Sequence, residues 1–167
     1  AGQFQSGIYL KEEAHLNPEK TMNALIGVLR EKVQFSPGAP KESAETLIID
    51  CRGIAANDPE LRGVKGETLI VRNPDFQLTR PVRIMHPRYP LYIIPRDNHH
   101  FMIGATQIES AENDTVSIRS GMELMSALYA LSPSFAEAEI VEIKAGSRPS
   151  YPDNLPRIKM SENTISC

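Results

Sequence analysis

The sequence predicts an α+β fold in which a mainly antiparallel, mixed sheet is flanked by two helices. Two segments, about 18–32 and 118–131, carry apolar residues at helical spacing. Short apolar runs bounded by glycine, proline or aspartate are typical of strands. No internal repeat is visible, and 167 residues suffice for one domain that buries roughly 70% of its unfolded surface. We therefore expect residues 1–167 to form a single domain.

Both helices are predicted from their start and stop signals as well as their spacing. Asn17 can cap the N–H groups of a first turn, and Pro18 is tolerated there because its missing N–H would have no partner in a helix anyway. The apolar positions that follow are Met22, Leu25, Ile26 and Leu29. The second helix is predicted to stop at Ser132, because Pro133 disfavours helix in the residue before it.

Five apolar runs predict strands, at 46–49, 67–71, 92–94, 101–103 and 139–143. The turn-rich spacer 95–100 indicates that the third and fourth runs form an antiparallel hairpin. Prolines confine the stretch 74–89 to loops or sheet edges. The residues after the last run, 145–149, are predicted to form a loop, so that Gly104 and Gly146 each end a strand.

Composition and charge exclude several classes of partner. The net charge is −3 and the Lys and Arg residues are scattered, so the sequence predicts no nucleic-acid partner. No apolar run approaches the roughly 20 residues that span a bilayer, so we expect no membrane partner either. The two cysteines, Cys51 and Cys167, lie far apart in the sequence and fit a reducing compartment, which makes the cytoplasm the expected location.

The usual motifs for nucleotides and metals are absent from these residues. There is no G-x-G-x-x-G, no G-x-x-x-x-G-K-[ST], no H-E-x-x-H and no C-x-x-C. His99 and His100 are adjacent, and in an extended backbone adjacent side chains point in opposite directions. We expect them to lie in a solvated turn and to bind no metal.

Four short motifs, in their order and spacing, resemble a known family. They are GVKGETL at 63–69, YIIPR at 92–96, IGAT at 103–106 and AGSRP at 145–149, and AHLNP at 14–18 precedes the first helix. Together they resemble glycine oxidases and related flavoenzymes of the D-amino-acid-oxidase type. The resemblance implies FAD as cofactor and a sheet-based domain that covers the flavin and binds a small amino acid.

The resemblance assigns roles to four residues of this sequence. It places Arg148 at the arginine that binds the substrate carboxylate, and the planar guanidinium suits that task because it can donate two parallel hydrogen bonds. It places Tyr92 at a tyrosine that assists the same carboxylate, although packing in a strand explains a tyrosine there equally well. Gly53 and Gly146 are the implied cofactor-binding residues. Arg96 and Arg157 rank below Arg148 as partners for an anion.

One segment departs from the family pattern. The run 50–56 resembles the strand-to-glycine turn beside the cofactor, but it has Arg52 where a small residue is usual and Ala55 where tryptophan is common. Of this turn, Gly53 alone matches. The contact expected from this turn is therefore close approach of a ligand to the backbone of Gly53.

The implied activity is oxidation of glycine or a similar small amino acid or secondary amine to an imino acid and hydrogen peroxide, with a role in making the thiazole of thiamine. Both ends of the family pattern are missing, so the chain is expected to be an internal fragment whose residues 46–60 border an FAD-binding domain. By itself it should be colourless and inactive.

The alternatives are a non-catalytic binding or assembly module and a subunit of a multi-subunit amine dehydrogenase. Formation of a homo-oligomer stays open.

Overall fold

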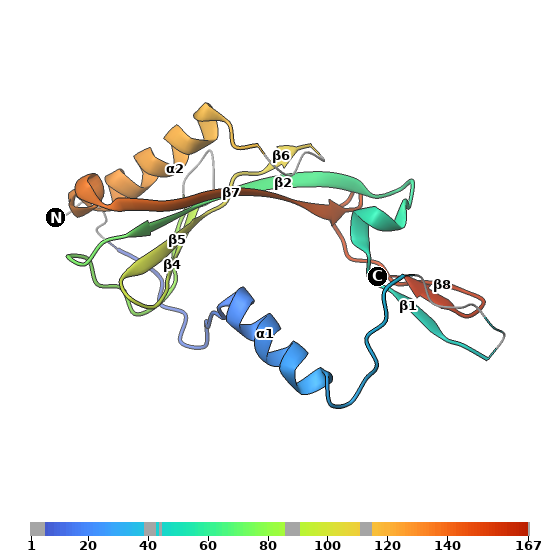
Figure 1. Ribbon diagram of the computed structural model, residues 1–167. Coiled ribbons are helices and arrows are strands. Elements are labelled where there is room, and N and C mark those ends of the chain that lie inside the picture. Colours follow the sequence, from blue (N-terminus) through green and yellow to red (C-terminus); the bar gives the residue numbers. More distant parts are fainter. Residues whose placement is uncertain (1–5, 39–42, 44, 86–90, 111–114, 167) are drawn as a thin grey trace. The chain divides into compact units, whose positions relative to one another are not determined.

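A computed structural model describes residues 6–38, 43, 45–85, 91–110 and 115–166 of the chain (Figure 1). Contacts within the chain divide it into two compact units. The first unit comprises Ala1–His15 and Gly63–Arg148, and the second comprises Leu16–Arg62 and Pro149–Cys167. Each unit is described separately below. The prediction that residues 1–167 make one domain stays a prediction.

The first unit is built on a six-stranded sheet in which every pairing with a defined register is antiparallel. Its strands are β2 (Arg62–Arg72), β3 (Val82–Ile84), β4 (Leu91–Pro95), β5 (His100–Gly104), β6 (Ile108–Glu109) and β7 (Glu139–Ser150). The neighbours follow the order β3-β4-β5-β2-β6, and β7 also pairs with β2. β4 and β5 form the hairpin that the spacer 95–100 predicts.

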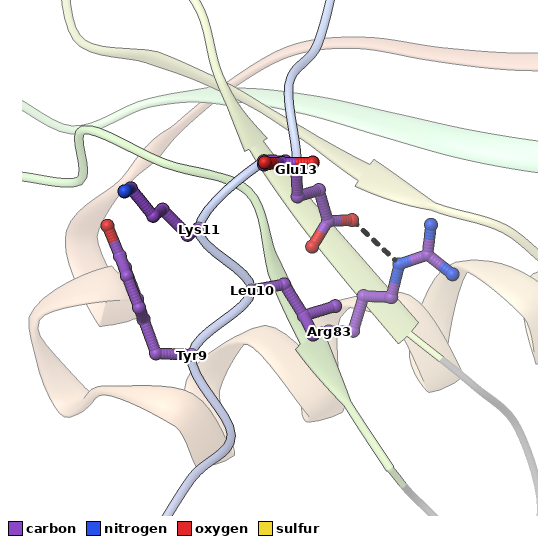
Figure 2. A pocket seen from close by; sticks show the side chains of 6 residues that line it. Tyr9, Leu10, Lys11, Glu13 and Arg83 are labelled. Carbon is purple, nitrogen blue, oxygen red and sulfur yellow. Dashed lines mark hydrogen bonds and ion pairs between the residues drawn. The ribbon is translucent and has the colours of Figure 1, made fainter.

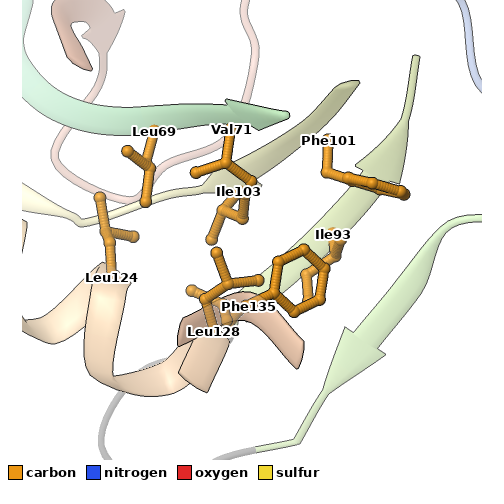
Figure 3. Packing of buried hydrophobic residues seen from close by; sticks show 9 residues of the cluster. Leu69, Val71, Ile93, Phe101, Ile103, Leu124, Leu128 and Phe135 are labelled. Carbon is orange, nitrogen blue, oxygen red and sulfur yellow. The ribbon is translucent and has the colours of Figure 1, made fainter. Parts of the chain in front are cut away.

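Helix α2 (Ile118–Leu131) lies against one face of this sheet and closes the core. Alternate residues of β2, β4 and β5 point toward the helix, since side chains alternate between the two faces of a strand. The buried cluster consists of Leu69, Val71, Leu91, Ile93, Phe101, Ile103, Leu124, Leu128 and Phe135 (Figure 3). The rings of Phe101 and Phe135 meet edge to face at 5.6 Å between centroids.

The boundaries of α2 follow from its capping residues. The Ser117 side chain accepts a hydrogen bond from the Ser120 N–H, which satisfies one of the free donors of the first turn. The helix ends at Leu131, and Ser132 before Pro133 is extended, as the proline predicts. A short 3-10 helix, η2 (Pro133–Glu137), then leads into β7.

The second unit contains helix α1 (Pro18–Leu29), a 3-10 helix η1 (Gly53–Ala56) and a three-stranded sheet. The strands are β1 (Ile48–Asp50), β8 (Lys159–Ser161) and β9 (Thr164–Ser166), in the order β1-β9-β8. β1 runs parallel to β9, and β8 runs antiparallel to it. The Asn17 side chain caps α1 by accepting from the Lys20 N–H at 3.2 Å, and no residue of this helix is buried.

The structure confirms the α+β class, with two helices and mainly antiparallel strands. The first helix stops at Leu29, short of Lys32. Residues 82–84 form an edge strand, which agrees with the prolines around them, and the predicted loop or edge at 86–90 lies outside the described residues. No helix in the part of the chain that the structure describes is long and apolar enough to cross a membrane.

One prediction about the backbone is wrong. Residues 145–149 do not form a loop, because β7 continues without a break to Ser150. Gly146 therefore lies inside a strand and does not end one, whereas Gly104 does end β5. The physical reason is that β2 pairs with β7, and that the residue before Pro149 is biased toward extended backbone.

Candidate functional site

The face of the six-stranded sheet that points away from α2 carries the predicted substrate residues, and we call it the second face. It is formed by the residues that alternate with the core positions of each strand. In β4 and β5 these residues are Tyr92, Ile94, Met102 and Gly104, and in β2 they include Thr68 and Ile70. The register places Gly104 between Tyr92 on one side and Thr68 on the other.

Tyr92 lies half-buried in the second face. Its cross-strand neighbours are Arg83 in β3 and Gly104 in β5. Burial raises the pKa of the Tyr92 hydroxyl, and the positive charges of Arg148 and Arg96 oppose that rise. The hydroxyl is thus protonated at neutral pH and can donate a hydrogen bond in a cationic environment.

Arg148 belongs to the last part of β7 in the first unit. Ile143 of the same strand packs against the core, so the even-numbered residues of this stretch, including Arg148, point to the second face. The Arg148 side chain is exposed, and its charge acts on the Tyr92 hydroxyl. Among the described residues, no group accepts a hydrogen bond from its guanidinium.

Arg96 follows β4 and turns its guanidinium back over the second face. One of its nitrogens lies 3.5 Å from the sulfur of Met102, and another lies 3.3 Å from Nδ1 of His15. Glu67 is no partner of Arg96 on this face, because it is buried and points to the opposite face of β2. Two arginines, Arg96 and Arg148, therefore act electrostatically on Tyr92.

A buried carboxylate, Glu67, lies on the α2 side of the sheet, and its only signal in the sequence is a single Glu in an apolar strand. Glu67 is fully buried, and its oxygens accept hydrogen bonds from the Ser117 N–H at 3.0 Å and the Thr106 hydroxyl at 2.9 Å. The ammonium of Lys65, itself buried, lies 3.5 Å away.

The pKa of Glu67 reflects this environment. Burial by itself raises the pKa of the carboxyl, but hydrogen bonds from Ser120, Ser117 and Thr106, together with the charge of Lys65, outweigh it and hold the pKa below its ordinary value. Glu67 is therefore ionised in the folded protein. It joins β2 to the start of α2 and to the residues that follow Gly104.

A shallow pocket of the first unit lies at the N-terminal segment, beside β3 (Figure 2). It is lined by Tyr9, Leu10, Lys11, Glu12, Glu13 and Arg83. Nε of Arg83 lies 3.2 Å from a Glu13 oxygen, so the guanidinium of Arg83 is already paired with a carboxylate. This pocket does not contain Arg148 or Tyr92, and its mixed charges define no ligand class.

The two glycines with an implied cofactor role differ in their surroundings. Gly53 has a φ of +59°, and a Cβ there would lie 3.1 Å from the Pro149 side chain, so the turn alone requires glycine. Gly146 has open space around it, because no atom lies within 4 Å of a Cβ built there. The bare backbone beside Arg148 fits the approach of a flat ring system such as a flavin. The described residues supply no phosphate-binding glycine motif for the rest of FAD.

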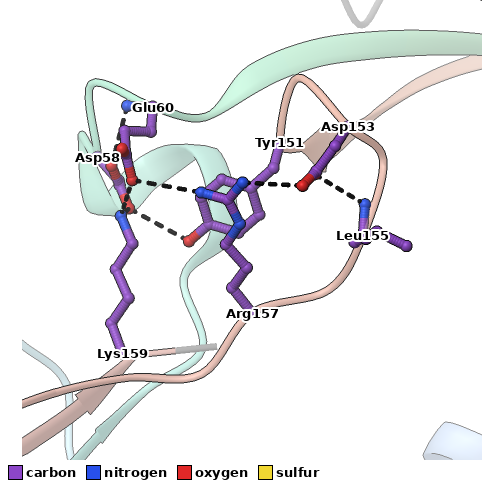
Figure 4. A network of polar contacts seen from close by, with 7 residues as sticks. All are labelled: Asp58, Glu60, Tyr151, Asp153, Leu155, Arg157 and Lys159. Atoms are coloured by element: carbon purple, nitrogen blue, oxygen red, sulfur yellow. Dashed lines mark hydrogen bonds and ion pairs between the residues drawn. The ribbon is translucent and has the colours of Figure 1, made fainter.

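The remaining charged candidates take part in structural contacts. In the second unit, Arg157 pairs with Asp153 at 2.9 Å and stacks over the Tyr151 ring, while Lys159 bridges Asp58 and Glu60 (Figure 4). Arg157 is thus already engaged with protein groups. His99 has a left-handed backbone in the turn before β5, and no group of three metal-ligating side chains occurs within the described ranges.

The first unit is α+β, with a helix on one face of its sheet and, on the other face, a tyrosine on which the charges of two arginines act. The family model for FAD-dependent oxidoreductases matches residues 1–166. The chain therefore belongs to the FAD-dependent oxidoreductase family. The resemblance that the motifs indicate is confirmed.

Individual relatives agree with the family. Over 170 residues the chain is 44% identical to a protein of Rhizobium etli named as the thiamine biosynthesis oxidoreductase ThiO, which covers 99% of this chain and 52% of that protein. It is 33% identical over 93 residues to a glycine oxidase of Geobacillus kaustophilus, covering 56% of this chain and 24% of that protein. The chain thus spans about half the length of the first relative and less of the second.

Solved structures show the same fold. The crystal structure of the glycine oxidase of Geobacillus kaustophilus matches with a TM-score of 0.56 at 28% identity, over 64% of this chain and 29% of that one. A glycine oxidase of Bacillus cereus matches with a TM-score of 0.62 at 24% identity, over 72% of this chain and 36% of that one.

Proposed function

We propose that the second face of the six-stranded sheet binds the carboxylate of a small amino acid or secondary amine in an FAD-dependent oxidase of the glycine oxidase type. The observation that carries the proposal is the joint placement of Arg148 and Tyr92. The positive charge of Arg148 acts on the Tyr92 hydroxyl, and its guanidinium donors have no acceptor among the described side chains. The relatives named as glycine oxidase and ThiO support the same reaction class.

The chemistry asks little of the protein beyond orientation. FAD, when bound, supplies the redox step, in which the substrate loses two electrons and becomes an imino acid. The fork of Arg148 can hold both carboxylate oxygens, and the protonated Tyr92 hydroxyl can donate a third hydrogen bond. Fixing the carboxylate fixes the position of the Cα–H bond that must break. The open backbone at Gly146 leaves room for the flavin ring at the same face.

The test is an Arg148→Ala substitution in the FAD-loaded holoprotein, assayed by hydrogen peroxide formed from glycine and from sarcosine. Truncating one partner of a charge-assisted pair costs about 2–5 kcal/mol. We therefore expect kcat/KM to fall about 30-fold to several-thousand-fold. Arg157→Ala is the matched control, since Arg157 is engaged with Asp153 and should leave the kinetics unchanged.

Unchanged kinetics in Arg148→Ala would remove this assignment. Peroxide formed in air distinguishes an oxidase from a dehydrogenase, which would need an artificial dye as electron acceptor. We extend the proposal to a role in thiamine synthesis on the strength of the Rhizobium etli relative. Release of an imino acid from glycine by the holoprotein is the reaction that this role requires.

A further inference from the structure

Gly104 occupies an unusual place at the end of β5. It lies opposite Tyr92 in β4, on the second face of the sheet. A Cβ built on Gly104 would lie 2.7 Å from the Tyr92 hydroxyl oxygen, 2.8 Å from Cζ and 3.0 Å from Cε2. These distances are shorter than van der Waals contact, so the ring of Tyr92 lies directly on the bare backbone of Gly104.

The φ angle of Gly104 does not itself require glycine. The glycines with positive φ in the described residues are Gly38 and Gly53, and Gly104 is not among them. Glycine inside or at the end of a strand is less favourable than a residue with a side chain, because it loses more conformational freedom on folding. The close approach of the Tyr92 ring, in contrast, leaves no room for a side chain at this position.

We propose that Gly104 is a positioning residue for carboxylate recognition: because it has no side chain, the Tyr92 ring rests against β5, which directs the hydroxyl toward the site of Arg148. The inference rests on the proposed function, since it assumes that the Tyr92 hydroxyl contacts the substrate. It adds a residue that touches neither substrate nor flavin and acts through Tyr92 alone.

The geometry also predicts the effect of a methyl group at position 104. The atoms that it would meet belong to the far end of the Tyr92 side chain, which can swing away by rotation about its own bonds. The three nearest atoms all belong to this side chain, and none of them is a backbone atom. Gly104→Ala should therefore leave the fold intact and displace the hydroxyl. Losing one hydrogen bond to a charged group weakens binding roughly 10- to 150-fold.

The experiment compares four forms of the FAD-loaded holoprotein: wild type, Gly104→Ala, Tyr92→Phe and the double variant. The probe is acetate, a carboxylate without an amine, whose binding is followed by the change in flavin absorbance. Gly66→Ala in β2 is the matched control, because a Cβ there would meet only Thr106 at 3.4 Å and Ala105 at 3.8 Å, which are ordinary contacts.

We expect Gly104→Ala and Tyr92→Phe to weaken acetate binding by similar factors, and Gly104→Ala to have no further effect in the Tyr92→Phe background. A second readout is independent of binding. The Cζ NMR signal of Tyr92, assigned by its absence in Tyr92→Phe, should titrate at a lower pKa in Gly104→Ala, because the displaced ring loses the burial that raises its pKa.

Three results would overturn the inference: wild-type acetate affinity in Gly104→Ala, an equal loss in the presence and absence of the Tyr92 hydroxyl, or loss of the fold in Gly104→Ala but not in Gly66→Ala. Failure of the proposed function looks different. In that case Tyr92→Phe and Arg148→Ala both leave acetate affinity unchanged. The pKa from the Tyr92 Cζ NMR signal still shows whether the ring position depends on Gly104.

Discussion

The two units of this chain differ in how far their apolar side chains are buried. In the first unit, side chains such as Ile93 and Ile103 are fully buried between the sheet and α2. In the second unit, apolar side chains of α1 and of the small sheet are exposed, for example Leu25 at 51%, Ile49 at 62% and Met160 at 76%. Tyr151 alone is buried among the described apolar residues of that unit.

Different forces therefore stabilise the two units. Burial of apolar surface, the main favourable contribution to folding, is concentrated in the first. The second unit depends on local devices: the Asn17 cap, the bonds from Arg52 to Asp50 that lower the pKa of Asp50 to about 2, and the polar network around Asp58 and Lys159. Each of these exposed contacts contributes little to the free energy of unfolding. The second unit should thus be the less stable region, and the following predictions test that difference.

The largest effect is expected from Glu67→Ala in the 167-residue chain. It would leave Lys65 as a buried charge without its carboxylate and would remove acceptors from Ser117 and Thr106. Breaking a buried pair in this way costs about 3–5 kcal/mol. Urea unfolding followed by circular dichroism should show the loss. Glu12→Ala, an exposed glutamate of the same unit, is the control and should unfold like the wild type.

The same substitution predicts a pH dependence. The pKa of Glu67 is lowered in the folded state, so its contribution is complete above the ordinary carboxyl pKa and declines as the pH falls below it. The wild type should therefore lose stability on acidification more steeply than Glu67→Ala does. If the unfolding free energies of the two proteins fall in parallel with pH, Glu67 does not have a lowered pKa in the folded state.

A pair of identical substitutions compares the units directly. Ile103→Ala removes a fully buried side chain from the core and should cost about 2–5 kcal/mol of unfolding free energy. Ile49→Ala removes a side chain that is 62% exposed and should change stability by less than about 0.5 kcal/mol. Hydrogen exchange of the β4–β5 hairpin and of β1 measures each effect locally. Equal effects would contradict the difference between the units.

The smallest effect is expected from Asn17→Ala, which removes the side-chain acceptor for the Lys20 N–H at the start of α1. A lost N-cap costs about 1 kcal/mol. Since no residue of α1 is buried, the loss should appear as faster exchange of the α1 amides alone, with the core of the first unit unaffected. Faster exchange in the core of the first unit as well would contradict the expectation that the effect stays within α1.

Local signals in the sequence predicted the elements whose boundaries are set by neighbouring residues. Asn17 and Pro133 mark helix ends that the structure reproduces, and the spacer 95–100 predicts the β4–β5 hairpin. The extent of β7 could not be predicted in this way. Its last residues include Gly146, which is unfavourable inside a strand, and the pairing of β7 with the distant strand β2 does not follow from any local pattern.

The candidate site shows the same division. Family motifs single out Arg148 and Tyr92, and their roles stay a prediction. The proximity of the two charges to one phenol, and the contact between the Tyr92 ring and Gly104, depend on strand register, which no local pattern encodes. The burial of Glu67 likewise follows from α2 docking over β2.

By itself, the sequence predicted both helices and five of the strands, the α+β class, the FAD-dependent family and the residue types suited to bind an acid group. Only the tertiary structure decided which apolar faces are covered, that 145–149 is strand, and that Gly104 supports Tyr92. The reason is physical: caps, turns and side-chain periodicity act over a few residues, whereas burial, cross-strand contacts and shifted pKa values arise from groups that folding brings together.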